Sequence, residues 1–229
     1  MTRLLVHVEG ETEETFVNEI LAPHLYQSGF TNVSARLLGH ARNRVRRGGI
    51  KPWPTVKDDI LRHLKKDAAC KATVMVDFYA LPARGDGGWP GRDAPINLTT
   101  EAKGLRVENA IHAEICAEFP VNPNECRFIP FVLMHEFEAL LFSDCAKFAT
   151  AVGKSALAQQ LSAIRDNFAT PEDINDSPQT APSKRIQDLI PNYEKLLFGF
   201  LAANEIGLET IRQQCPNFAK WLTRLEESI

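Results

Sequence analysis

The chain has 229 residues, of which 44% are hydrophobic and 24% are charged, and it contains 13 Gly and 14 Pro. These proportions are those of an ordinary globular protein, so they exclude disordered, collagen-like and coiled-coil classes. The formal net charge of −3 hides an uneven distribution, because basic residues concentrate between Arg36 and Lys66 whereas glutamates dominate the segment before them.

The strand and helix patterns alternate through the first part of the chain. Strands are expected at Leu4–Glu9, Asn32–Leu38, Ala72–Tyr79 and Cys126–Met134. Between them we expect a helix capped by Thr12 and kinked or ended by Pro23, then helices at Thr55–Lys66 and Thr99–Ala117. This order predicts an α/β fold with a mostly parallel four-stranded sheet and helices on both faces.

From His135 onward the pattern turns helical and no further strand is expected. We therefore divide the chain into an α/β domain at residues 1–143 and a helical extension at 144–229 that packs on it. A Gly- and Pro-rich loop at residues 80–98 is long enough to be functional or mobile.

The chain carries no signal for a membrane or for disulfides. No apolar run approaches the roughly 20 residues of a membrane helix, and the N-terminus turns acidic too early for a secretory signal. We expect a cytoplasmic protein that does not contact membranes. The cysteines form no C-x-x-C pair, and we expect all of them to be reduced and buried; they are Cys70, Cys116, Cys126, Cys145 and Cys215.

Three acidic residues fall where an α/β fold binds its ligands. Glu9 ends the first predicted strand and Asp77 ends the third, and ligands of open parallel sheets bind beyond the carboxyl ends of the strands. Glu13 follows at the start of the next helix, so its side chain can lean over the same point. Carboxylates without His or Cys suit Mg²⁺ or Mn²⁺ rather than zinc. The alternative is that these acids are solvated caps, which are common in such positions.

The surrounding motifs resemble those of Toprim domains. The sequence V-E-G-E-T-E after the first strand is similar to the first Toprim motif, especially in overcoming-lysogenization-defect (OLD) nucleases, where both glutamates are metal ligands. That resemblance implies metal-binding roles for Glu9 and Glu13, and V-M-V-D implies one for Asp77. Topoisomerase and primase Toprim domains continue as Asp-x-Asp, whereas this chain has Tyr79. Asp86 or Asp93 in the long loop is a candidate for the missing ligand.

A second resemblance extends over nearly the whole chain. The motifs D-F-Y-A-L-P, H-E-F-E-A-L-L-F-S-D, P-E-D-I-N, A-P-S-K-R-I and C-P-N-F-x-x-W-L together resemble a bacterial Toprim-like family, the domain of unknown function 4276. The resemblance implies a Toprim-like fold and a role in defence against phage or mobile DNA, beside an ATPase partner.

The fourth strand ends in a further acidic pair, Glu136 and Glu138. Residues two apart face one way on a strand but diverge on a helix, so we expect one of them to face the metal site and slightly favour Glu136. The alternative for Glu138 is the polar side of an amphipathic helix. For His135 we expect a capping or hydrogen-bonding role.

Two basic groups are candidates for binding nucleic acid. The first has an aromatic neighbour, Trp53, which suits phosphate contact combined with base stacking, and consists of Arg42, Arg44, Arg46, Arg47 and Lys51. The second is Lys184 and Arg185, next to Ser183 as a possible helix cap. Cations at a helix start oppose the helix dipole, so we expect there either a phosphate or a structural ion pair with Glu172 and Asp173 nearby. Simple solvation is the alternative for the first group.

Two functions follow as hypotheses. The first is a Mg²⁺- or Mn²⁺-dependent phosphodiesterase acting on DNA or RNA, in which Glu9, Glu13, Asp77 and Glu136 are catalytic and Glu138 is a further metal ligand. The second is a non-catalytic partner that binds nucleic acid or nucleotide and regulates an ATPase, which Tyr79 favours.

Overall fold

A computed structural model describes residues 1–39, 49–83, 85–93, 97–119, 126–174, 177 and 179–229. Four strands form one sheet in the order β2-β1-β3-β4, and each neighbouring pair is parallel. The strands are β1 (Arg3–Val8), β2 (Asn32–Leu37), β3 (Cys70–Asp77) and β4 (Phe128–Leu133). The α/β fold expected from the sequence is confirmed.

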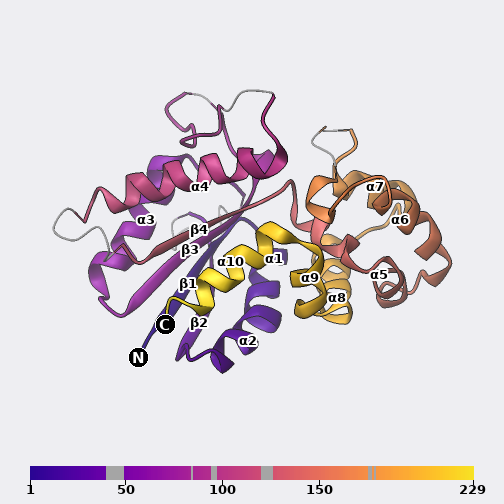
Figure 1. Ribbon diagram of the computed structural model, residues 1–229, viewed down its shortest axis with the longest axis horizontal. Helices are drawn as coiled ribbons and strands as arrows, with labels where there is room; N and C mark the ends of the chain where they lie inside the picture. Colours follow the sequence, from indigo (N-terminus) through magenta and orange to yellow (C-terminus); the bar gives the residue numbers. More distant parts are fainter. Residues whose placement is uncertain (40–48, 84, 94–96, 120–125, 175–176, 178) are drawn as a thin grey trace.

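Helices cover the sheet and continue beyond it (Figure 1). Those of the first half are α1 (Glu11–Phe16), α2 (Ala22–Gln27), α3 (Trp53–Lys66) and α4 (Thr100–Cys116). Those of the second half are α5 (Cys145–Ala151), α6 (Ala158–Arg165), α7 (Pro182–Leu189), α8 (Lys195–Ile206), α9 (Leu208–Gln214) and α10 (Pro216–Glu226). Helices α5 to α8 gather beyond the carboxyl ends of the strands, whereas α10 returns to cover the sheet. In the described ranges, no helix has both the length and the apolar character that a membrane crossing needs.

Successive side chains of each strand point to opposite faces of the sheet and pack into two separate hydrophobic cores. Val6 and Val8 of β1 belong to the core that α1, α2 and the C-terminal helices share. Val74 and Val76 of β3 belong to the other core, beneath α3 and α4. Because successive strand residues face opposite sides, both faces of the sheet are covered, as expected.

Helix α10 is attached to the sheet by a tryptophan. The Trp221 ring stacks on Phe131 of β4, with ring centroids 4.6 Å apart and planes inclined by 10°. Its indole Nε1–H donates a hydrogen bond of 3.0 Å to the Thr73 hydroxyl of β3. Burial of one such large side chain is worth roughly 1.5–3 kcal/mol, so the C-terminal helix contributes directly to the core of the sheet.

The first helix differs in detail from the expectation. Its N-cap residue is Gly10, in extended conformation, and Thr12 lies inside α1. Pro23 does not end the helical segment, because the widened π-helical turn Val17–Leu21 leads directly into α2, where Pro23 occupies the first turn. A proline is tolerated there because the π-helical turn already interrupts the regular α-helical hydrogen-bond pattern where the proline N–H is missing.

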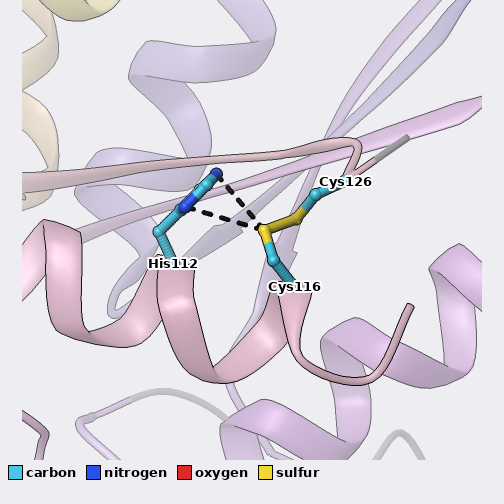
Figure 2. The surroundings of a disulfide bond; sticks show 3 residues. All are labelled: His112, Cys116 and Cys126. Atoms are coloured by element: carbon cyan, nitrogen blue, oxygen red, sulfur yellow. Dashed lines mark hydrogen bonds between the residues drawn. A yellow bond between two sulfur atoms is a disulfide. The ribbon is translucent and has the colours of Figure 1, made fainter. Parts of the chain in front are cut away.

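One expectation about the cysteines is wrong. Cys116 at the end of α4 and Cys126 before β4 form a disulfide, with an S–S distance of 2.00 Å (Figure 2). His112, one turn earlier on α4, lies 3.4 Å from Cys116 through its Nε2 atom. Spacing alone did not reveal the pair, because it forms only where the end of α4 and the start of β4 meet. The other three cysteines are free and buried, as expected.

Candidate functional site

Glu9 and Asp77 come together because their strands are neighbours. β1 and β3 pair in parallel, with Val8 beside Met75. Glu9 comes directly after Val8, and Asp77 comes two residues after Met75. Both acids therefore lie at the carboxyl edge of the two central strands. Adjacent strands lie about 4.8 Å apart. The sequence predicted that both acids lie at strand ends, and the strand order places those ends side by side.

Asp77 lies at the centre of the negative charge. Its Oδ1 atom accepts a hydrogen bond of 3.1 Å from the backbone N–H of Phe137. Burial raises the pKa of Asp77 well above its usual range, and the charges of the surrounding glutamates raise it further; these are Glu13, Glu9, Glu138 and Glu136. The charges of all four glutamates proposed from the sequence therefore act on this aspartate.

Glu9 has an unsatisfied buried oxygen. Burial, followed by repulsion from Glu13, raises the pKa of Glu9 to about 7, although backbone hydrogen bonds at Asp77 and Ile50 act in the opposite direction. Its Oε2 atom is buried and has no hydrogen-bond partner in the described part of the chain. A buried carboxylate oxygen without a donor is costly, so this atom is suited to accept a proton or a cation.

Glu13 folds back over the glycine that begins its helix. Only 7% of Glu13 is exposed, and its Oε2 atom would lie 2.9 Å from a Cβ atom placed on Gly10. A side chain at position 10 would therefore push the Glu13 carboxylate away. Burial raises the pKa of Glu13, and the charge of Glu138 adds to this effect.

The 3-10 helix Phe137–Ser143 after β4 brings the remaining acids to the site. Glu138 is 2% exposed. The Glu136 carboxylate accepts a hydrogen bond of 3.0 Å from the backbone N–H of Ser183. The sequence led us to expect that only one of the two glutamates faces the site, but the charges of both act on Asp77. The turn that begins at Phe137 is neither a strand nor an α-helix, so neither simple periodicity applied.

Sequence reasoning missed Lys195, the cation of this cluster. Its Nζ atom lies 2.9 Å from Glu138 Oε1. The charges of Glu138, Glu136 and Asp77 raise the pKa of Lys195 against the opposing effect of burial. Lys195 is the first residue of α8, where a cation opposes the helix dipole. That unfavourable position was the available signal in the sequence.

Tyr193 extends the site beside Lys195. Its buried hydroxyl has no hydrogen-bond partner among the described residues. Burial raises the pKa of Tyr193, and the charge of Glu138 raises it further, so the hydroxyl stays protonated and can donate a hydrogen bond.

The donor set fits a hard divalent cation better than a soft one. Oxygen donors from Glu9, Glu13 and Asp77, with one buried oxygen unsatisfied, match the preferences of Mg²⁺ and Mn²⁺. Among the described residues, no three of these carboxylates place one oxygen each within 4.8 Å of one another. Mg²⁺ usually keeps several of its waters, which accommodates ligands that stand further apart.

The first basic group lies only partly within the described chain. Arg42, Arg44, Arg46 and Arg47 fall outside the described residues, and Lys51 is half-buried. Trp53 is not available for base stacking, which corrects the expectation: it is buried, its Nε1–H donates to Glu114, and its ring centroid lies 5.0 Å from that of Trp89. Its apolar ring is used in the core beneath α3.

The second basic group is explained by contacts within the protein. The N-cap residue of α7 is Ala181 rather than Ser183, and the carboxylate at this helix start is Glu136. Arg185 donates to the Thr180 carbonyl at 2.8 Å and lies over the Phe168 ring. Lys184 contacts Gln187. The carboxylate at this helix start is thus Glu136 and neither of those expected, because Glu172 accepts from the backbone of Asn217 and Phe218 and Asp173 accepts from that of Thr170.

The loop acids do not complete the cluster. Asp86 is exposed, and Asp93 lies 3.6 Å from Arg106. Tyr79 falls in the 3-10 helix Phe78–Ala80 and not in β3, and its ring centroid lies 5.9 Å from that of His135. The second position after Asp77, where Asp-x-Asp has its second aspartate, is thus occupied by a tyrosine in an aromatic contact.

Comparison with known proteins gives the family and no more. No curated protein and no solved structure matches this chain. Residues 8–226 match the family described as Domain of unknown function (DUF4276), which covers both the acidic cluster and the helices that complete it. The chain therefore belongs to the DUF4276 family.

Proposed function

We propose that the protein is a phosphodiesterase that acts on DNA or RNA with Mg²⁺ or Mn²⁺ held by Glu9, Glu13 and Asp77. The observation that carries the proposal is the convergence of five carboxylates on one edge of the sheet with one nearby lysine, Lys195. Such a concentration of negative charge, in which Glu13 and Glu138 are buried, is unfavourable without cations. The V-E-G-E-T-E and V-M-V-D motifs, which resemble those of Toprim domains and OLD nucleases, fall on these same residues.

Several residues of the site would have separate roles in binding a phosphodiester. A divalent cation at this site would polarise a phosphoryl oxygen and activate water. Lys195 is half-exposed and can contact a phosphate oxygen. Glu138 holds this lysine at the edge of the cluster, and Glu136 is held in turn by the start of α7.

The arginine-rich segment supports nucleic acid as the substrate. Two described residues near this sequence segment contact the start of the cluster: Leu38 donates to the carbonyl of Val8 at 2.9 Å, and Gly49 donates to the carbonyl of Glu9 at 2.7 Å. An arginine-rich sequence suits the binding of a polyanion.

A cleavage assay tests the proposal. Wild type and Glu9→Gln are incubated with Mn²⁺ and labelled single- and double-stranded DNA and RNA, with and without ATP and the ATPase partner. Because the amide is nearly isosteric but lacks the charge, we expect native folding and a rate at least about 10³-fold lower. Glu108→Gln, a buried acid outside the cluster, is the control and should cleave like wild type.

Two outcomes would overturn the proposal. If Glu9→Gln cleaves as fast as wild type, the activity does not depend on the cluster. If wild type is inert on every substrate with all components present, the alternative applies, in which the protein is a non-catalytic partner that binds nucleic acid or nucleotide and regulates the ATPase.

A further inference from the structure

A second group of metal-ligating side chains lies between β1 and α3, in the other core layer. His7 of β1, Asp59 of α3 and His63 of α3 each offer one atom, and these atoms lie within 4.8 Å of one another. The Nε2 atom of His7 is 4.0 Å from Asp59 Oδ2, and that of His63 is 3.9 Å from Asp59 Oδ1. We propose that these three residues form a zinc site, separate from the carboxylates and not required by the phosphodiesterase proposal.

The imidazole of His7 presents a lone pair to the carboxylate. His7 is fully buried, and its Nδ1 atom lies 3.3 Å from the carbonyl oxygen of Thr73. A carbonyl only accepts hydrogen bonds, so Nδ1 carries the hydrogen and the neutral ring leaves Nε2 unprotonated. A histidine held by a carbonyl through one nitrogen while the other nitrogen faces a ligand position is the arrangement of metal-bound histidines.

Neither Nε2 atom is satisfied by the protein. Both are buried and lack a hydrogen-bond partner within the described ranges, and distances near 4 Å to Asp59 are too long for a hydrogen bond. The lone pair of His7 Nε2 points toward a carboxylate and repels it unless a cation lies between them. Zinc bonds to nitrogen and oxygen are about 2.0–2.2 Å long, so a small contraction of the group would complete them.

The carboxylate is fixed by arginines from the outside. Arg36 of β2 donates to Asp59 through Nε at 2.9 Å and through Nη2 at 3.1 Å, and Arg62 donates through Nη1 at 2.8 Å. Hydrogen bonds of this kind orient the ligands of metal sites. The two guanidinium groups also repel a cation, so we expect weaker binding than in closed structural zinc sites.

The ligand set leaves one position open. Two imidazoles and one carboxylate suit zinc, and three protein ligands are typical of sites that keep a fourth position for water or substrate. His63 and Arg36 also line a cavity of about 350 Å³, together with Glu14. The three-residue group therefore borders this cavity through His63.

The other histidine-containing group provides the control. His112, Cys116 and Cys126 also lie within 4.8 Å of one another, but the two sulfurs are bonded to each other (Figure 2). A disulfide lacks the thiolates that bind zinc, so this group should not bind the metal under non-reducing conditions.

A cobalt titration tests the site. Metal-free full-length protein is titrated with Co²⁺ without reductant, because nitrogen-ligated tetrahedral Co²⁺ absorbs strongly in the visible range and Zn²⁺ abolishes the band by displacement. Wild type should bind one equivalent with this band. His63→Phe, which keeps the ring, and His63→Gln should lower the affinity at least about tenfold and remove the band. His112→Phe should behave as wild type.

Circular dichroism of each variant confirms that it is folded, and His63 tolerates replacement because it is partly exposed. The proposal is overturned if wild type shows no tetrahedral band, if both folded His63 variants keep it, or if His112→Phe loses it.

Discussion

Burial raises the pKa of Glu9, Glu13, Asp77 and Glu138, so these carboxylates are costly to ionise, and Lys195 offsets part of that cost at Glu138. The side chain of Glu138 is 3% exposed and depends on Lys195 at 2.9 Å for its ion pair. A charged group that loses its partner inside a protein is left with its desolvation penalty. The sequence revealed Glu9, Glu13 and Asp77 because acids at strand ends form a local pattern. It did not reveal Lys195, which lies in a distant helix and approaches only through tertiary packing.

Lys195→Met should therefore destabilise the protein at neutral pH, by roughly 1–3 kcal/mol, because Glu138 remains buried without its charged partner. In the double variant Lys195→Met with Glu138→Gln, much of this loss should be recovered. Urea unfolding of wild type, both single variants and the double variant measures the coupling. Strictly additive effects would show that the pair does not stabilise the fold.

At the scale of elements, the sequence predicted where the strands are but not which strands lie next to each other in the sheet. Apolar, β-branched runs predicted β1 and β3, but only the order β2-β1-β3-β4 brings Glu9 beside Asp77. The same holds for α8, which approaches α1 closely at Gly199: a Cβ atom there would lie 3.0 Å from Thr12 Cγ2. This contact between two distant helices brings Lys195 to the acids, and no pattern within either helix encodes it.

A glutamate from α4 accepts a backbone hydrogen bond from strand β4, which lies at the edge of the sheet. The Oε1 atom of Glu108 accepts a hydrogen bond of 3.0 Å from the backbone N–H of Val132, and Arg224 of α10 lies 3.5 Å from Oε2. Covering an edge strand in this way protects it from pairing with another chain. Burial raises the pKa of Glu108 to about 7, against the opposing effects of Val132 and Arg224.

The raised pKa of Glu108 determines the direction in which the free energy of unfolding changes with pH. The folded state holds the proton more tightly than the unfolded state, so this contribution to stability is complete below about pH 4.5 and is lost as the pH rises to about 7. The loss should be on the order of 3 kcal/mol. Glu172, whose pKa burial also raises to about 7, acts in the same direction, so the comparison must be made between variants.

Glu108→Gln should remove the Glu108 part of this loss, because an amide imitates the protonated acid. Relative to wild type, the variant should gain stability between pH 4.5 and pH 8, as measured by urea unfolding at each pH. A difference between the two proteins that does not vary with pH would contradict the assignment.

At the scale of the whole molecule, the acidic cluster depends on both halves of the chain. The strands supply Glu9 and Asp77, the turn after β4 supplies Glu136 and Glu138, and α8 supplies Lys195. One continuous core contains residues of β1 and residues of α10. The order of the predicted elements indicated helices that pack on the sheet. It could not predict that one of them would contribute Lys195 to the acidic cluster, since that depends on contacts between residues far apart in sequence.

The central claim is that the cluster holds a divalent cation, and a Mn²⁺ titration by calorimetry tests it most directly. Wild type and Glu108→Gln should bind Mn²⁺ with equal affinity, whereas Asp77→Asn should bind at least about tenfold more weakly. The asparagine can still accept the hydrogen bond from Phe137, so the fold should be kept while the charge is lost. Mn²⁺ at a hundredfold excess over its dissociation constant should also stabilise wild type by about 2.7 kcal/mol. Equal Mn²⁺ affinity in wild type and folded Asp77→Asn would contradict the account.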